Sequence, residues 1–393
     1  MSKENIFKKE ISNYLDDASP SNIHLYWKGR VALYAILKAA SIGMGDEVIL
    51  PAYTCVVVPN AIIYTGATPV YVDVDFDSFN ANMQNIERAI TPNTKAIICQ
   101  NTFGLSSQVN EIAMLAKEKN ILSIEDCTHG FGGKFNDNYN GTYCDAAFFS
   151  TQWNKPFSTG VGGFSFIKND ALNEKVISQN KNLCKPSLVK KASLSLQLFM
   201  RKTLLTDRTY WVLVPLYRML SKKNIVLGSS SGLEITSADE PKNYLMAMSN
   251  VQINSGIKNI KKLPDLLKIR KTNAAKYTRL LSELGLNHPQ ENLSENHAFL
   301  KYPVLVKERL AVMTLAEKHK ISLGDWLNSP LHPIQKDFET WKMNVNDFPN
   351  AKFAGEHMIN LPLESGVDKA VKFIEIIKEH IYTKQEIESM QKT

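Results

Sequence analysis

Short apolar segments alternate with helix-forming segments through the first 170 residues of this 393-residue chain. The apolar segments are rich in β-branched and aromatic side chains and predict strands, whereas the segments between them carry apolar residues at helical spacing. The predicted strands lie within 45–51, 68–75, 94–101, 120–126, 145–150 and 161–169. The predicted helices lie within 25–40, 52–66, 81–90 and 108–119. Such alternation is typical of βαβ crossovers, so we expect an α/β fold with a mostly parallel sheet.

The pattern changes in the second half of the chain. Residues 170–240 are basic and helix-rich, and a long helix interrupted near Pro264 is expected over 241–282. Shorter strand and helix patterns follow to the end, including a terminal helix over 366–391. We therefore expect a large three-layer domain over 1–240, with a basic helical insertion at 180–230, and a smaller α+β domain over 241–393.

Composition excludes several classes of protein. Hydrophobic residues make up 44% of the chain and charged residues 22%, which is ordinary for a globular protein. The net charge of +7 is too mild to suggest a nucleic-acid partner, and no apolar run is long enough for a transmembrane segment. The five cysteines form no CxxC pair, and the first residues lack the apolar core of a signal peptide. We expect a cytoplasmic protein with free thiols and no metal site.

The positive charge is concentrated in one stretch. Residues 185–223 hold nine lysines and arginines against one acidic residue, Asp207, with apolar and aromatic residues between them. The plainest interpretation is the solvated face of an amphipathic helical hairpin. Two functional interpretations stay open, namely a rim that attracts an anionic substrate and a contact with a membrane surface.

Two motifs at predicted strand ends carry the candidate chemistry. They are IEDCTHGFGG at 124–133 and FFSTQWNKPFSTGVGG at 148–163, and they contain Asp126 and Lys155. Ligands of parallel sheets bind beyond the carboxyl ends of the strands, where Asn101, Asp126 and Ser150 are expected. A structural ion pair between Asp126 and Lys155 is one interpretation. The other is a pyridoxal phosphate site, which needs a lysine, an acid for the pyridine nitrogen, and donors for the phosphate.

The chain lacks the motifs of other common sites. No GxGxxG follows the first predicted strand, and no GxxxxGK[ST] occurs, so phosphate loops for dinucleotides or nucleoside triphosphates are missing. HExxH is absent, which disfavours a zinc peptidase, and the GSSSG tract at 228–232 is interpreted as a break between segments and not as the nucleophile elbow of a serine hydrolase.

Taken with further segments, the two motifs resemble the DegT/DnrJ/StrS family of sugar aminotransferases, which have the fold type I pyridoxal phosphate architecture. The resemblance runs from Gly29 to Leu363. The other segments that carry it are KGRVAL (28–33), GDEVILPAYTCVVVPNAI (45–62), GATPVYVDVD (66–75) and FPNAKFAGEHMINLPL (348–363). Each segment alone is weakly specific, whereas their order and spacing together are highly specific.

The resemblance implies roles for six residues. Lys155 would form the Schiff base with pyridoxal 5'-phosphate and move the proton, and Asp126 would pair with the pyridine nitrogen. His129 occupies the position that contacts the region of the ring hydroxyl; otherwise it is a satisfied loop histidine.

The remaining three residues fall where the family holds the cofactor phosphate. Ser150 would donate its hydroxyl to that phosphate, or it merely caps a strand end. Gly29 and Arg30 stand where the family has Gly-Thr at the start of a helix. Arg30 would pair with the phosphate or point to solvent.

Three departures from the family pattern are visible. Cys55 replaces the aromatic residue that stacks on the cofactor ring in many members, and Thr151-Gln152 replaces Phe-His. The family's Asn-x-Arg-Met reads Leu245-Met246-Ala247-Met248, so the asparagine that reaches the partner subunit's phosphate is absent at that place. Asn243 is a possible substitute.

The resemblance implies a homodimer that transfers an amino group from an amino acid, most often glutamate, to a ketone or aldehyde sugar. The basic stretch and Arg30 favour an anionic sugar acceptor of bacterial lipopolysaccharide, with 8-amino-3,8-dideoxy-manno-octulosonate as candidate product. The alternatives are a nucleotide-linked 3-keto or 4-keto hexose as acceptor, and a non-catalytic sugar-binding or interaction protein. Dehydratases of the family replace the lysine by histidine, so Lys155 disfavours them.

Overall fold

The computed structural model describes most of the chain. The described ranges are 1–106, 108–204, 232–289 and 297–391, with positions 209, 213, 214, 216, 217, 219 and 220 between the second and third. Most of the predicted basic hairpin after residue 204 therefore lies outside the described residues.

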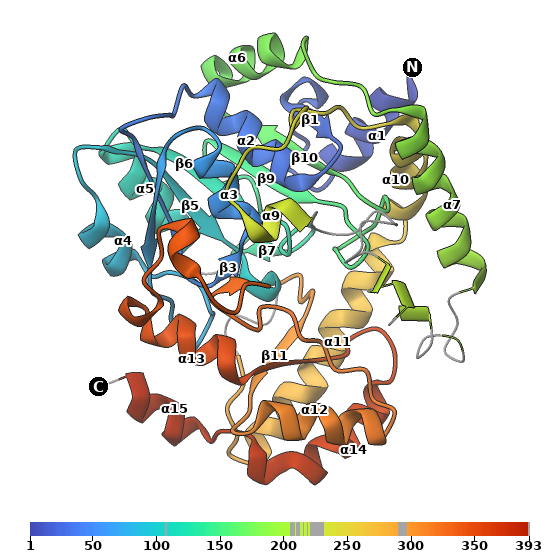
Figure 1. Ribbon diagram of the computed structural model, residues 1–393. Coiled ribbons are helices and arrows are strands. Elements are labelled where there is room, and N and C mark those ends of the chain that lie inside the picture. Colours follow the sequence, from blue (N-terminus) through green and yellow to red (C-terminus); the bar gives the residue numbers. More distant parts are fainter. Residues whose placement is uncertain are drawn as a thin grey trace.

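A seven-stranded sheet forms the centre of the N-terminal part (Figure 1). Its strands, in spatial order, are β1 (Ile23–Tyr26), β10 (Gly163–Ile167), β9 (Ala146–Ser150), β6 (Leu122–Asp126), β5 (Thr94–Gln100), β2 (Glu47–Pro51) and β4 (Thr68–Val72). The five strands from β9 to β4 pair in parallel, whereas β10 and β1 pair antiparallel at one edge. This arrangement confirms the predicted α/β fold with a mostly parallel sheet.

Helices cover both faces of the sheet because alternate strand residues point to opposite cores. On β2, Val48 and Leu50 join one hydrophobic cluster while Ile49 joins another. Three helices pack toward the first cluster, namely α2 (Gly29–Ala39), α3 (Val57–Ile63) and α6 (Asp170–Asn180). Two helices, α4 (Met83–Ala89) and α5 (Val109–Glu118), pack toward the second. The result is the predicted three-layer arrangement.

One predicted helix starts later than its local pattern suggests. Residues 52–66 were expected to be helical, yet α3 begins only at Val57. The two residues of β3 (Thr54–Cys55) instead pair in parallel with β12 (Leu331–His332), almost 280 residues further along the chain. A contact over that sequence distance leaves no local signal in the sequence.

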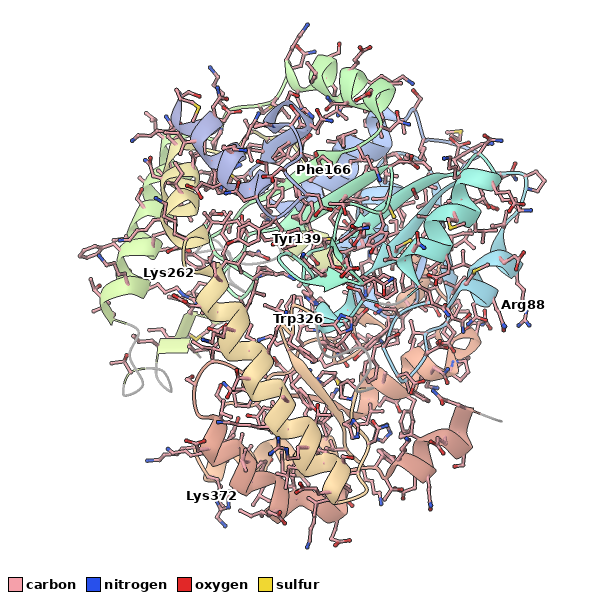
Figure 2. The ribbon with its side chains drawn as sticks, turned by 180° about the vertical axis from the view of Figure 1, so that it is seen from behind. Arg88, Tyr139, Phe166, Lys262, Trp326 and Lys372 are labelled. Atoms are coloured by element: carbon pink, nitrogen blue, oxygen red, sulfur yellow. The ribbon has the colours of Figure 1, made fainter. Side chains whose placement is uncertain are left out.

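The C-terminal part begins with two helices, and Pro264 lies in the second, a long helix that starts just after Lys262 (Figure 2). They are α10 (Asn250–Ile260) and α11 (Leu263–Glu283), and Pro264 lies in the first turn of α11, where a missing amide hydrogen costs nothing. Ile253 and Ile260 of α10 pack with Phe7 of α1 (Lys3–Ser12) in an N-terminal cluster. The division near residue 240 stays a prediction, and from this packing we propose that the second unit starts at α11.

In the described residues after α11, a small antiparallel sheet and four α-helices follow. The sheet pairs β11 (Tyr302–Leu305) with β13 (Met358–Leu361). The helices are α12 (Arg309–Lys318), α13 (Pro349–His357), α14 (Val367–Ile377) and α15 (Lys384–Gln391). The terminal helix expected over 366–391 is thus two helices with a break between them. None of the helices in the described ranges is both long and apolar enough to cross a lipid bilayer.

We predict that Phe149→Ala strongly destabilises the N-terminal part. Phe149 of β9 is fully buried and stacks on Phe164 of β10 with ring centroids 4.4 Å apart, and Phe131 packs against both rings. Removing a ring from such a core costs about 3–5 kcal/mol of unfolding free energy. Urea unfolding measures the loss, with the exposed Met114→Ala as control. A loss for Phe149→Ala no larger than that of the control would contradict the packing described here.

Candidate active site

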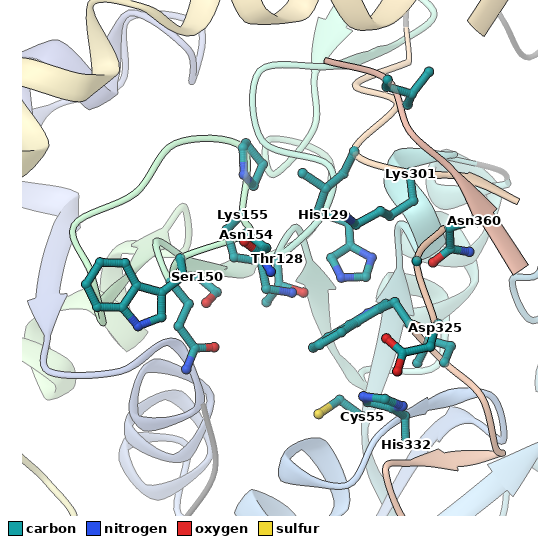
Figure 3. Close-up of a pocket in the computed structure, with 18 of the residues that line it drawn as sticks. Cys55, Thr128, His129, Ser150, Asn154, Lys155, Lys301, Asp325, His332 and Asn360 are labelled. Atoms are coloured by element: carbon teal, nitrogen blue, oxygen red, sulfur yellow. The ribbon is translucent and has the colours of Figure 1, made fainter. Parts of the chain in front are cut away.

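A cavity of about 2240 Å³ opens at the carboxyl ends of the parallel strands (Figure 3). Its wall combines residues of the N-terminal part, such as Asp126, Ser150 and Lys155, with residues of the C-terminal part, such as Lys301 and Trp326. The sheet end and the C-terminal elements thus enclose one common space, which is where a parallel sheet is expected to bind its ligand.

Lys155 lies in the loop that joins β9 to β10, and its side chain reaches the cavity (Figure 3). Burial lowers the pKa of its ammonium to about 8, although the nearby Asp126 carboxylate acts in the opposite direction. Its Nζ lies 4.8 Å from the centroid of the Trp326 ring. Lys155 is therefore an amine that loses its proton far more readily than an ordinary lysine.

Asp126 ends β6 and is buried in the same cavity. Its Oδ1 accepts a hydrogen bond from the Thr128 amide at 2.9 Å. Burial raises the pKa of its carboxyl, while the bonds from Thr128 and the Lys155 charge oppose that rise. Within the described ranges the side chains of Asp126 and Lys155 influence each other without forming a direct salt bridge. A purely structural ion pair is therefore not what this geometry shows.

His129 lies on the cavity wall, where its ring is held in one orientation. Its Nδ1 accepts a hydrogen bond from the Phe103 amide at 3.1 Å, and burial keeps its pKa well below the usual value. A neutral ring that accepts at Nδ1 carries its proton on Nε2. His129 is thus both a satisfied loop histidine and a potential donor toward the cavity.

Gly29 brings the start of α2 into close contact with the end of β9. A Cβ at Gly29 would lie 2.8 Å from the Phe149 carbonyl oxygen and 2.9 Å from the Ser150 Cβ. The first-turn amides of α2 therefore lie beside the Ser150 side chain, at the cavity. The N-terminus of an 11-residue helix has amides without helical partners and a positive partial charge, so it is suited to a phosphate.

Arg30 is buried beside this helix start, so of the two alternatives for this residue the one in which it points to solvent is wrong. Its Nη1 lies 2.7 Å from Oε1 of the buried Glu234, and Lys28 Nζ lies 3.4 Å from the other carboxylate oxygen. Glu234 belongs to a short helix, α9 (Gly232–Thr236). No local sequence pattern pointed to this acid, because Glu234 lies 204 residues further along the chain than Arg30.

These residues fit pyridoxal phosphate. A glycine packed too tightly for any side chain places helix amides and a hydroxyl at one end of the cavity, where a phosphate needs donors. A partly buried amine and a buried carboxylate lie on the same cavity wall. All six predicted site residues line this cavity.

Two further candidates do not line it: Asn101, which was expected at a strand end, and Asn243, the possible substitute for the family's asparagine. The side-chain amide of Asn101 donates a hydrogen bond to the buried Glu125 at 2.9 Å, so Asn101 contacts the residue before Asp126 and not the cavity. Asn243 accepts a contact from the Cys184 thiol, away from the cavity wall.

The sequence did not point to the aromatic and charged residues that the C-terminal part adds. Trp326 contacts Lys155, and its ring centroid lies 4.6 Å from that of His332 and 5.8 Å from that of His129. His332 pairs with Cys55 across β3 and β12, so Trp326 lies near the position that lacks an aromatic residue. Lys301 is a further cavity lysine, and burial lowers its pKa.

The basic stretch contributes to the rim. Arg201 lies 5.2 Å from the centroid of the Trp153 ring and donates to the Asn154 side chain at 3.3 Å. These two residues precede Lys155 in the chain, so the basic stretch contacts the loop that carries the candidate lysine.

Comparisons with known proteins agree with this geometry. Residues 4–377 match the model of the DegT/DnrJ/EryC1/StrS aminotransferase family. A GDP-perosamine synthase of Caulobacter vibrioides is 27% identical over 345 residues, which is 87% of this chain and 80% of that enzyme. The GDP-perosamine synthase of Escherichia coli O157:H7 is 41% identical over 149 residues, but that match spans only 38% of this chain and 41% of the enzyme.

The fold is also similar to that of solved structures. NtdA from Bacillus subtilis with bound cofactor PMP superposes with a TM-score of 0.70. The superposition covers 96% of this chain and 78% of that protein at 22% sequence identity. An identity this low supports a common fold.

We predict that Lys155 in the cofactor-free protein reacts with an acylating reagent with a midpoint near pH 8. The reason is that burial lowers its pKa to about 8 and only the free amine reacts. In Asp126→Asn the midpoint moves to lower pH, because the carboxylate that raises the pKa is gone. Mass spectrometry of the Lys155 peptide measures the extent of reaction, with the exposed Lys95 as reference. A midpoint that moves to higher pH in Asp126→Asn would contradict the electrostatic arrangement.

Proposed function

The chain belongs to the DegT/DnrJ/EryC1/StrS family and is a pyridoxal-phosphate-dependent sugar aminotransferase, and we propose that Lys155 and Asp126 are its catalytic residues. The observation that carries the proposal is that the buried Asp126 and the partly buried Lys155 share the wall of one cavity, which also receives the start of α2. The amino donor is proposed to be glutamate. The protein is proposed to act as a homodimer, as the family resemblance implies.

Lys155 is proposed to hold and move the proton at its Nζ. Pyridoxal phosphate, when bound, supplies an electron sink for the bonds at the amino-bearing carbon. A general acid and base is most effective when its pKa lies near the working pH, and burial places the pKa of Lys155 at about 8. The amine can therefore take a proton and return it without a large energy cost in either direction.

Asp126 is proposed to stabilise a positive charge on the ring nitrogen. Its carboxyl is buried, so it ionises most readily when a cation lies beside it. The Thr128 amide already holds one carboxylate oxygen and fixes the orientation of the group. His129, with its proton on Nε2, is proposed to donate to the ring oxygen.

The start of α2 is proposed to hold the phosphate. The amides of Gly29 and Arg30 and the hydroxyl of Ser150 provide neutral donors there. Arg30 and Lys28 add positive charge, which Glu234 partly neutralises. The role proposed for Arg30 is thus a cation held in place by Glu234.

The acceptor is proposed to be an anionic sugar, with the 8-aldehyde of 3-deoxy-manno-octulosonate as first candidate and lipopolysaccharide as its destination. Lys301 on the cavity wall and Arg201 at the rim support a negative charge on the acceptor. A nucleotide-linked 3-keto or 4-keto hexose is the second candidate. The cavity exceeds the usual ligand pocket of about 300–1,000 Å³ and leaves room for such a molecule.

We predict that Lys155→Ala lowers turnover by far more than tenfold, since a tenfold change is only about 1.4 kcal/mol of the barrier. After borohydride reduction of the loaded protein, mass spectrometry is expected to find the cofactor mass on the Lys155 peptide. Lys301→Ala is the matched control and keeps that mass on Lys155. Attachment to Lys301 in the parent protein, or turnover of Lys155→Ala within tenfold of the parent, would contradict the assignment.

We predict that the enzyme charged with glutamate aminates the octulosonate aldehyde in preference to a nucleotide-linked keto hexose when both are supplied together. Its Michaelis constant for the sugar acid should rise with salt, because screening weakens attraction by the basic rim. Product masses give the outcome. Exclusive amination of the nucleotide sugar would reject the sugar-acid acceptor and leave the aminotransferase assignment intact.

A further inference from the structure

The helix α7 (Leu188–Leu204) has an apolar stripe on each of two opposite faces. Leu194 is fully buried on its inner face, where Leu198 also packs against a cluster with Trp153 and Val161. On the outer face, six apolar side chains are 45–79% exposed: Leu188, Val189, Leu196, Phe199, Met200 and Leu204. At 3.6 residues per turn these six fall within an arc of about 160°. The outer face therefore differs from the polar, solvated face that the sequence suggested.

The outer stripe is unlike the scattered exposed apolar residues that most proteins carry. Figure 1 shows α7 along the outside of the molecule beside α10. Leu216 and Met219, further along the chain, are also 44% and 48% exposed. A contiguous exposed apolar face on one helix indicates a surface that binds another protein or a membrane.

Basic residues border the outer stripe on both sides. By helical angle, Lys190 and Arg201 lie along one border and Lys191 and Lys202 along the other. The side chains of Lys190 and Arg201 reach from their border toward the body of the protein, where they contact Met246 and Trp153. The segment 181–204 contains six lysines and arginines and no acidic residue. The surface thus combines apolar side chains in the middle with positive charge at the edges.

We propose that this stripe, defined by the six exposed residues of α7, docks on a membrane surface that carries anionic phosphate headgroups. A helix with an apolar face bordered by lysine and arginine lies in the plane of such a surface, where apolar side chains enter the acyl boundary and the cations meet lipid phosphates. The helix lies flat and does not span the bilayer.

A second copy of the chain fits this stripe less well. In a two-fold contact the same patch meets itself, so the basic borders of the two copies would face each other. With no acidic residue in 181–204, like charges would repel across such an interface. An anionic lipid surface instead neutralises both borders.

Docking through α7 would bring the cavity rim close to the membrane. Arg201 belongs to α7 and contacts Trp153 and Asn154, the two residues before Lys155. The membrane proposal rests only on the surface of α7. It therefore does not depend on which sugar is the amino acceptor.

The test is sedimentation of the full-length protein with vesicles of phosphatidylglycerol and of phosphatidylcholine. The parent protein is expected to bind the phosphatidylglycerol vesicles at least tenfold more tightly at low salt, and the affinity should fall as salt rises. The double variant Leu196→Glu/Phe199→Glu is expected to lose at least tenfold in that affinity. The matched control Met114→Glu/Leu310→Glu changes two equally exposed apolar residues elsewhere and is expected to bind like the parent.

Three results of the vesicle experiment would overturn the proposal. They are parent protein that binds neither vesicle at low salt, equal binding to both lipids, and equal loss of binding in the control variant. Light scattering after gel filtration tests the other candidate occupant, a second copy of the chain. A molecular mass that halves in Leu196→Glu/Phe199→Glu would assign the stripe to a subunit interface and would also overturn the membrane proposal. Both double variants should keep turnover of a water-soluble acceptor, so loss of docking is distinguishable from loss of the enzyme.

Discussion

The parallel pairing of β6 with β9 is the constraint on which the site depends. Its register sets Asp126 opposite Phe148, so the carboxylate ends one strand just where the next strand leads to Ser150 and on to Lys155. A slip of one residue would turn each of these side chains to the other face of the sheet. The hydrophobic layers on both faces prevent that slip, because alternate residues of β9 belong to different cores, Phe148 to one cluster and Phe149 to another. Core packing thus fixes where the charged groups lie.

Burial then gives those groups their chemistry. The same loss of water lowers the pKa of Lys155 and raises that of Asp126, while the attraction between the two charges limits both shifts. Pyridoxal phosphate needs an amine whose pKa lies near 8 and a carboxylate that ionises when a cation lies beside it, and Lys155 and Asp126 supply these two groups. The close approach of Gly29 to β9 adds the helix amides at the other end of the cavity.

Sequence patterns predicted the parts of the molecule that local rules govern. The parallel strands, the helices between them and the presence of the six candidate residues on one cavity wall follow from periodicity, strand-end chemistry and family motifs. The parts that the sequence did not reveal are contacts between distant segments. The pairing of Cys55 with His332, the approach of Trp326 to Lys155 and the ion pair of Arg30 with Glu234 join residues 170 or more positions apart. The apolar outer stripe of α7 was hidden for another reason, since a helix with two apolar faces shows no clear period that separates them.

A crystal structure of the protein grown with pyridoxal phosphate would test the central claim most directly, because it shows which residues hold the cofactor. The predicted result is density continuous from the cofactor to Lys155 Nζ, with Asp126 within hydrogen-bond distance of the ring nitrogen and the phosphate at the start of α2. Cofactor joined to another lysine, or a ring nitrogen without Asp126 beside it, would contradict the assignment of these two residues.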